Sequence, residues 1–138
     1  MSKFWEAVSQ FGPLVGRILL AHIFLISGWA KVTGFAGTTA YMKGYGMPLV
    51  EPLAVGAILI ELGGGIALIL GWQARWAALA ILLFTIPATL IFHNFWAVDA
   101  AQVQGQMIHF MKNLCIMGGM LYVMAFGAGP LSMDNRKT

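Results

Sequence analysis

Four long apolar runs, separated by shorter polar or glycine-rich segments, dominate the hydrophobicity pattern of the chain. The runs cover residues 14–32, 53–72, 76–92 and 108–126. A bilayer hydrocarbon core of roughly 30 Å requires about 20 residues of α-helix, and each run approaches that length. The pattern therefore predicts an all-α fold, in which residues 1–138 form a single domain, an integral membrane four-helix transmembrane bundle.

The segments between the runs have compositions of their own. Residues 1–12 are amphipathic and are expected to lie at the membrane surface. Residues 34–52, rich in glycine, predict a loop with one or two turns of interfacial helix. Residues 93–109 predict a second loop on the same side, folded over the mouth of the bundle as a lid that buries Trp96, because apolar side chains outnumber the single charge of Asp99.

The composition agrees with a protein that lies almost entirely in the bilayer. Hydrophobic residues make up 59% of the chain and charged residues 9%, whereas a soluble domain carries about 25% charged residues. The formal net charge is +3, but the basic residues are scattered and form no stripe suited to nucleic acid. A single cysteine, Cys115, excludes an internal disulfide, a dithiol redox pair and a cysteine-ligated cluster.

The distribution of basic residues near the ends of the runs predicts the orientation. Cytoplasmic loops carry an excess of lysine and arginine. One side of the predicted bundle has five such residues and the other has three: Lys3, Arg17, Arg75, Arg136 and Lys137, against Lys31, Lys43 and Lys112. Both termini are therefore expected in the cytoplasm.

Glu61 lies near the middle of the second run. A carboxylate at that depth costs a few kcal/mol on insertion scales, so it normally faces the bundle interior and has a partner. At helical spacing Ala57, Glu61 and Gly64 share one face, which we expect to point inward. Helix depths estimated from the rise per residue favour Lys112 as the cation that pairs with Glu61, followed by Lys31.

Two further stripes of the predicted helices carry polar residues. At 100° per residue the first helix aligns five residues on one line, Arg17, Ala21, Phe24, Gly28 and Lys31. Arg17 is expected to extend its charge to the cytoplasmic headgroups, and His22, off this stripe, to be a hydrogen-bonded core residue. The fourth helix aligns His109, Lys112, Asn113 and Ile116.

The half of the bundle away from the termini thus gathers a polar constellation, formed by Lys31, Glu61, His93, Asn94, His109, Lys112 and Asn113. Two interpretations stay open. The residues form a site, or they are structural, with an ion pair that fixes the helices, a lysine that reaches the headgroups and interfacial histidines.

Four segments resemble the DoxX family of small four-helix bacterial membrane proteins. They are RILLAHIFLISGWAKVTGF (17–35), Met47-Pro48, ELGGGIALILGWQARWAAL (61–79) and HNFW…MIHFMKNL (93–114). The resemblance covers about residues 13–132 and implies a four-span bundle in a bacterial inner membrane. The family takes its name from a subunit of a thiosulfate:quinone oxidoreductase. Related quinone-linked bundles carry cysteine pairs, which this chain lacks.

The leading functional hypothesis is a quinone-linked oxidoreductase, or its membrane subunit, with a quinone pocket in the periplasmic half. Proton transfer and catalysis are assigned to Glu61, Lys112 and His109, and no metal site is expected. Binding of the quinone is assigned to Lys31, His93, Asn94, Trp96 and Asn113. Two alternatives stay open: a non-enzymatic scaffold that docks redox or detoxification enzymes, and a small-molecule or metal-ion carrier. Expected partners are the bilayer, a quinone, and other proteins or further copies of the chain.

Overall fold

The structure, a computed structural model, describes residues 2–136 and is entirely helical in its regular elements there. The elements are α1 (Lys3–Thr33), α2 (Phe35–Gly44), α3 (Val50–Ile58), the π-helix η1 (Leu59–Gly63), α4 (Gly64–Leu70), α5 (Ala74–Phe92), the 3₁₀-helix η2 (Phe95–Ala97) and α6 (Ala100–Phe126). Four helical stretches are long and apolar enough to cross a membrane: α1, the continuous α3–η1–α4 helix, α5 and α6. The predicted four-span, all-α bundle is confirmed.

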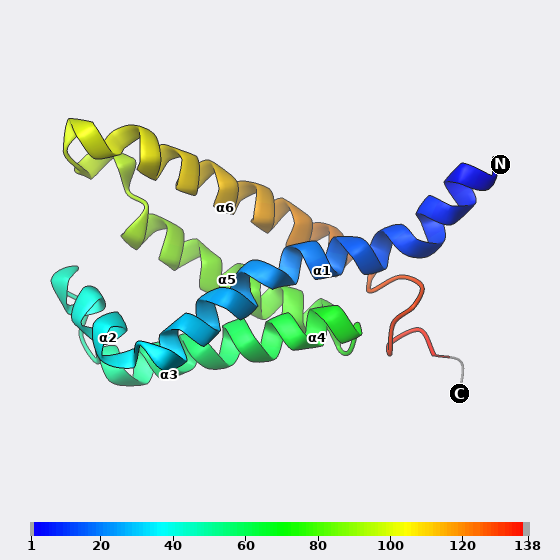
Figure 1. The fold of residues 1–138 in the computed structure, drawn as a ribbon, viewed down its shortest axis with the longest axis horizontal. Helices are drawn as coiled ribbons and strands as arrows, with labels where there is room; N and C mark the ends of the chain where they lie inside the picture. Colours follow the sequence, from blue (N-terminus) through cyan, green and yellow to red (C-terminus); the bar gives the residue numbers. More distant parts are fainter. Residues whose placement is uncertain (1, 137–138) are drawn as a thin grey trace.

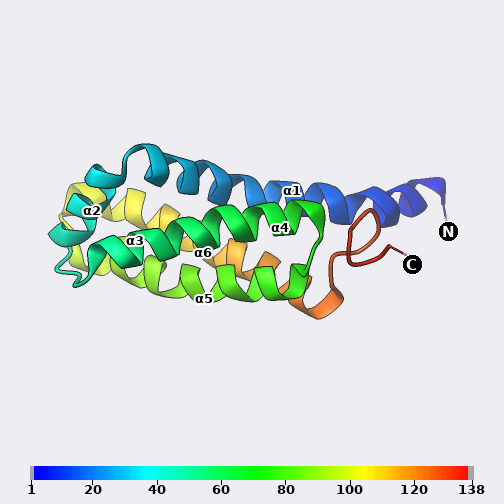
Figure 2. The ribbon, with the colours of Figure 1, turned by 90° about the horizontal axis from the view of Figure 1, so that it is seen from below.

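The helices form two pairs that meet at the end of the molecule carrying the termini. The α3–η1–α4 helix runs beside α1, and α5 runs beside α6 (Figures 1 and 2). Toward the other end α6 diverges from α1, and α2 lies across that end next to α3 (Figure 1). Both described chain ends lie at the same end of the bundle, as an even number of spans requires (Figure 2).

Several predicted boundaries change. Residues 3–12 continue α1 instead of forming a separate lead-in, although the helix bends near its blue N-terminal turns (Figure 1). Pro13 explains the bend, because it lies inside the helix and has no backbone N–H to donate to the preceding turn. α2 is a ten-residue helix, where the sequence predicted one or two turns.

The predicted lid at residues 93–109 is wrong. α6 begins at Ala100, so only residues 93–99 connect it to α5. Residues 100–107 contain three glutamines and a glycine, which interrupt the apolar pattern and favour a loop, but glutamine and alanine are good helix formers. Trp96 is 59% exposed, and its ring packs against Phe95 and Phe110 and not over the bundle.

Small side chains dominate the interior between the helices. The largest buried cluster contains Ala21, Ala67, Ala74, Ala77, Ala78, Leu68, Ile81 and Met120. Because lipid and a hydrophobic core are equally apolar, membrane helices associate through close packing, which small residues allow. The predicted stripe of α1 is confirmed, since its buried residues are Arg17, Ala21, Phe24 and Gly28.

Arg17 does not reach the headgroups as predicted, because it is 2% exposed and bonded inside the protein. Its guanidinium donates to the carbonyls of Leu68 (3.1 Å), Ile69 (3.2 Å) and Leu131 (2.8 Å). The first two carbonyls belong to the last turn of α4, where few backbone donors remain, and that of Leu68 also accepts from the Gly71 N–H at 3.1 Å. Gly71 allows this contact, because it has a φ of 63° and a Cβ there would collide with the guanidinium.

The C-terminal segment completes this end of the bundle. The Asp134 carboxylate accepts hydrogen bonds from the backbone N–H groups of Gln73 (2.7 Å) and Ala74 (2.8 Å). It therefore caps the N-terminus of α5 from a distant part of the sequence. His22, expected in the core, is exposed on α1 and its Nδ1 donates to the Leu19 carbonyl at 2.6 Å.

Candidate functional site

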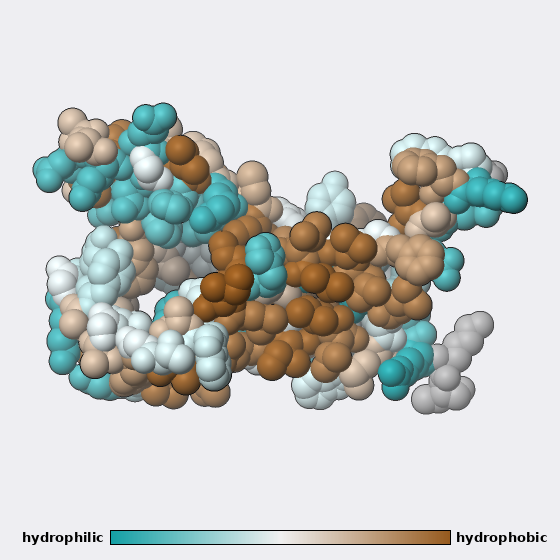
Figure 3. Space-filling model, viewed as in Figure 1, coloured by the Kyte–Doolittle hydropathy of each residue, from teal (hydrophilic) through white to brown (hydrophobic). Residues whose placement is uncertain are grey.

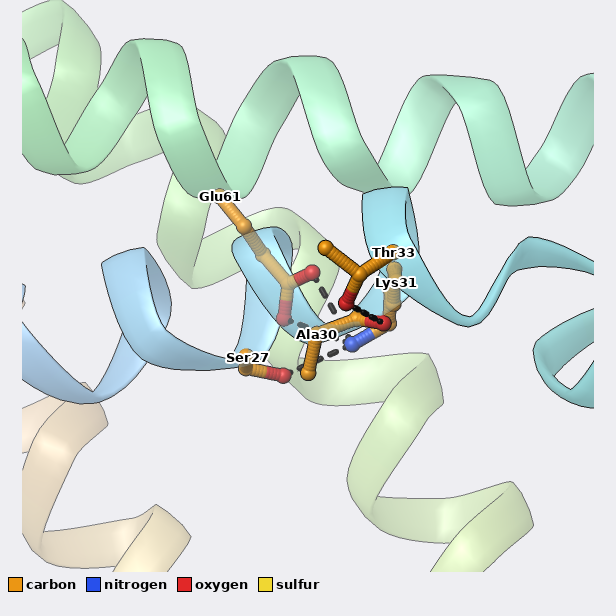
Figure 4. Close-up of polar contacts among 5 residues, drawn as sticks. All are labelled: Ser27, Ala30, Lys31, Thr33 and Glu61. Carbon is orange, nitrogen blue, oxygen red and sulfur yellow. Dashed lines mark hydrogen bonds and ion pairs between the residues drawn. The ribbon is translucent and has the colours of Figure 1, made fainter.

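Glu61 is 3% exposed and pairs with Lys31 (Figure 4). The Lys31 Nζ donates to Glu61 Oε1 at 3.1 Å and lies 3.0 Å from Oε2, and it also donates to the Ser27 hydroxyl at 2.7 Å. The sequence favoured Lys112 as the partner of Glu61. That order is wrong, because α1, and not α6, is packed directly against the helix that carries Glu61.

A local irregularity positions the carboxylate. Glu61 is the third of the five residues of η1, the π-helical turn inserted between α3 and α4. A π-turn adds one residue to the helical repeat and is frequent at functional sites. The opposing residue of α1 is Gly28, where a Cβ would come within 2.9 Å of the Leu62 side chain and 3.1 Å of Glu61 Cβ. The close approach of α1 to η1 thus depends on a glycine.

One oxygen of the buried carboxylate lacks a hydrogen bond. Oε2 lies near the Lys31 ammonium, but the geometry of that contact makes no hydrogen bond, and among residues 2–136 no other donor reaches this atom. Lys31 therefore compensates the charge, although one oxygen of the buried carboxylate makes no hydrogen bond. Because an unsatisfied buried acceptor is costly, a hydrogen bond from a ligand to this carboxylate would be favourable.

Glu61 lines the central cavity, a space of about 850 Å³ between the two helix pairs. Figure 3 shows the molecule hollowed at the α2 end, on the face seen in that view. Apolar side chains from α1, η1, α5 and α6 form most of the wall, including Phe24, Ile60, Phe84 and Ile116. The polar groups of the wall include Ser27, Lys31, Glu61, Thr85, His93, Lys112 and Asn113.

Five of the eight predicted site residues line the central cavity: Lys31, Glu61, His93, Lys112 and Asn113. The Asn113 amide donates to the Thr89 hydroxyl at 2.9 Å, which joins α6 to α5. His109, Asn94 and Trp96 are not part of the wall. Trp96 belongs to an aromatic group with Phe95 and Phe110 on the outside of the α5–α6 connection.

The two groups of polar residues predicted to form one constellation are separate. Lys31, Glu61 and Ser27 are joined on one wall of the central cavity. On the other wall Lys112 lies 3.2 Å from His109 Nδ1, and His93 lies 2.9 Å from the Gln106 side-chain oxygen. No ion pair joins the two walls among the described residues.

α2 closes part of the α2 end of the cavity through an aromatic contact with α5. The Tyr41 ring stacks on Phe92 with a centroid distance of 5.5 Å, and Tyr45 meets the same ring edge-on at 5.0 Å. The two phenol oxygens are 3.1 Å apart. Burial, followed by the hydrogen bond to Tyr45, raises the pKa of Tyr41 to about 12, so the phenol stays neutral at physiological pH.

The tyrosines, Ser27 and the π-turn were not recognised from the sequence as parts of a site. Ser27 precedes Lys31 by four residues, a spacing that could have paired them on one helix face. Within residues 2–136, no three histidine, cysteine or carboxylate side chains gather in a way that could hold a metal ion.

Together, the fold and this cavity define a small four-span membrane protein with a buried ion pair beside a ligand-sized space. The chain belongs to the DoxX family, whose profile matches residues 12–94. It is 40% identical to the inner membrane protein YqjF of Escherichia coli over 94% of each chain. It is 34% identical to the E. coli inner membrane protein YphA, covering 89% of this chain and 88% of that one. The chain is a multi-pass protein of the bacterial inner membrane.

A more distant relative is the Surfeit locus protein 4 homolog of Schizosaccharomyces pombe, 28% identical over 90% of this chain and 37% of that protein. No solved structure matches the chain.

Proposed function

We propose that the central cavity binds a quinone and that the protein is a quinone-linked oxidoreductase or the membrane subunit of one. The observation that carries this proposal is the buried Glu61, which lines an otherwise mostly apolar cavity and whose Oε2 makes no hydrogen bond. Ligand sites typically have volumes of about 300–1,000 Å³, an apolar lining and a few polar groups that orient the ligand. The cavity of about 850 Å³ fits that description.

A quinone matches the cavity in both its polar and its apolar parts. Its carbonyl oxygens accept hydrogen bonds, which the ammonium groups of Lys31 and Lys112 are able to donate. The hydroxyl of the reduced form, the quinol, donates a hydrogen bond, which the Glu61 carboxylate would accept. The ring and the isoprenoid tail suit the aromatic and aliphatic wall between the helix pairs.

The residues around Glu61 also suit the proton chemistry of such a ligand. Reduction of a quinone to a quinol consumes two electrons and two protons, and oxidation releases them. Glu61 would exchange a proton with the ligand oxygen, while Lys31 and Ser27 balance the change in charge at the carboxylate. The electrons would pass between the quinone and a redox-active protein bound to this one.

The proposal is tested by purifying the protein with its bound lipids and analysing the extract for quinone. A Glu61→Ala variant should lose most of the quinone that copurifies with the wild type. A Glu51→Ala variant is the matched control, because Glu51 pairs with Lys43 at the exposed surface, outside the cavity wall. A wild-type extract without quinone, together with no change in melting temperature on adding a quinone, would argue against the proposal.

The second candidate, a non-enzymatic scaffold, is favoured by the bonds that join the helices through buried polar groups. The Lys31–Glu61 pair and the Arg17 contacts both connect elements far apart in the sequence. If these groups only hold the bundle together, their removal should lower stability without changing the binding of any quinone. Quinone binding also separates the proposal from the third candidate, a small-molecule or metal-ion carrier. A carrier would transport a solute and would not bind added quinone.

A further inference from the structure

Three basic side chains from α6 and the end of α5 lie together, and two of them, His93 and Lys112, line the central cavity. His93 follows the last residue of α5, and His109 and Lys112 lie one turn apart on α6. The two imidazole rings have a centroid distance of 5.1 Å, and Lys112 Nζ is 3.2 Å from His109 Nδ1. We call His93, His109 and Lys112 the basic cluster.

The basic cluster has no acidic neighbour within the described chain. Lys112 makes no ion pair there, while Glu61 and Glu51 are paired with Lys31 and Lys43. Asp99 is the one acidic residue between residues 74 and 126. It precedes His109 by ten residues, which corresponds to about 15 Å of helix at 1.5 Å per residue. The cluster therefore carries positive charge that the rest of the described protein does not neutralise.

This charge is located inside the membrane-spanning part and is accessible from outside. Asn113, the neighbour of Lys112, is bonded to Thr89 of α5, which fixes Lys112 about one turn below the end of that helix. His109 and Lys112 are both exposed, and they belong to the N-terminal half of α6, which diverges from α1 (Figure 1). An unpaired charge at such a position is costly, so a partner from the bilayer is favoured.

The hydrogen bonding of the cluster specifies the kind of partner. The ammonium of Lys112 has only donors, so in its contact with His109 the Nδ1 atom is the acceptor. Neutral His109 then carries its proton on Nε2, which is also a donor. Lys112 and His109 therefore offer donors to a ligand, which suits an anionic oxygen group, while His93 Nδ1 donates to the Gln106 side-chain oxygen.

We propose that the basic cluster binds the anionic headgroup, a phosphate or a carboxylate, of a lipid-like molecule whose chain enters the opening between α1 and α6. Lys112, Ile23 and Ile116 all line the central cavity, so an acyl chain whose headgroup is held by the cluster has apolar surface within the same cavity. This inference shares Lys112 and the central cavity with the proposed quinone site, but it rests on the unpaired charge of the basic cluster, and its test is scored with lipids in the absence of quinone.

The test is a lipid titration of the purified protein followed by native mass spectrometry. Phosphatidylglycerol should bind at least about fivefold more tightly than phosphatidylcholine, whose phosphate is offset by its choline cation, since the attraction of an anionic lipid to one basic residue contributes about that much. Lys112→Gln should remove most of this preference. Lys43→Gln, which changes an exposed lysine already paired with Glu51, should keep it.

Two further probes identify the source of the anionic group. Oleate that competes with phosphatidylglycerol supports a site that accepts carboxylates as well as phosphates, whereas binding of phosphatidylglycerol alone supports a phospholipid site. Equal affinity of the wild type for phosphatidylglycerol and phosphatidylcholine would overturn the proposal. Inorganic phosphate that binds as tightly as the phospholipid would overturn it too, because the chain would then contribute nothing.

Discussion

Lys31 and Glu61 show how strongly a buried charge depends on its neighbour. Both partners were recognisable from the sequence, since a carboxylate inside an apolar run requires a cation. The sequence did not determine whether Lys31 or Lys112 pairs with Glu61, because depth estimates along a helix do not show which helices pack against each other. The free oxygen of Glu61 was also unpredictable, as it depends on the angle at which Lys31 approaches.

The buried pair should be strongly coupled in stability measurements. Glu61→Gln or Lys31→Met alone should lower the free energy of unfolding by roughly 3–5 kcal/mol, because each leaves a buried charge without a partner. The double variant should recover much of that loss. Denaturant titration in detergent measures both. If the two single losses simply add in the double variant, the residues are not coupled.

At the scale of elements, the apolar runs predicted the four spans, and the helix boundaries depended on local chemistry that hydropathy does not report. The first turns of α6 contain Gln102, Gln104 and Gln106, and these polar residues led to the prediction of a loop there. The π-turn at Leu59–Gly63 has no signal in the hydrophobicity pattern, and it lies where Gly28 of α1 packs against Glu61 and Leu62.

The contact between α1 and η1 should depend on Gly28. Gly28→Val should lower the free energy of unfolding by about 1–3 kcal/mol, because its side chain would overlap Leu62 and separate the helices. Gly16→Val is the control, since a Cβ at that position of the same helix meets no atom within 4 Å. A Gly28 variant as stable as the Gly16 variant would contradict the close packing described here.

The contacts of Arg17 should also contribute to stability. Arg17→Met should lower the free energy of unfolding by roughly 3 kcal/mol, since it removes charge-assisted hydrogen bonds to carbonyls of α4 and the C-terminal segment. Arg75→Met, at an exposed position at the same end of the bundle, should change stability little. Equal melting temperatures for the two variants would show that Arg17 acts only as a surface charge.

For the whole molecule, the structure places both described chain ends at one end of the bundle, but the compartment follows only from the distribution of lysine and arginine (Figure 2). The two helix pairs and the space between them depend on the sum of many small contacts. The sequence therefore indicated which residues are polar and at what depth in the membrane they lie. It did not indicate that these residues would lie on two separate walls of the central cavity.

The orientation is tested with reporters fused to the C-terminus. Green fluorescent protein, which fluoresces when it folds in the cytoplasm, should be bright, and alkaline phosphatase, which requires export, should be inactive. The reverse pattern would place both termini in the periplasm and the central cavity in the cytoplasmic half of the bundle.

Quinone binding at Glu61 is tested most directly by equilibrium titration of the protein in lipid nanodiscs with a short-tailed ubiquinone and its quinol. We expect saturable binding of the quinol to the wild type. Glu61→Ala should weaken it by about tenfold or more, because a hydrogen bond to a charged group is lost. Glu51→Ala should bind like the wild type. Binding that is absent in the wild type, or equally strong in Glu61→Ala, would contradict the role assigned to this carboxylate.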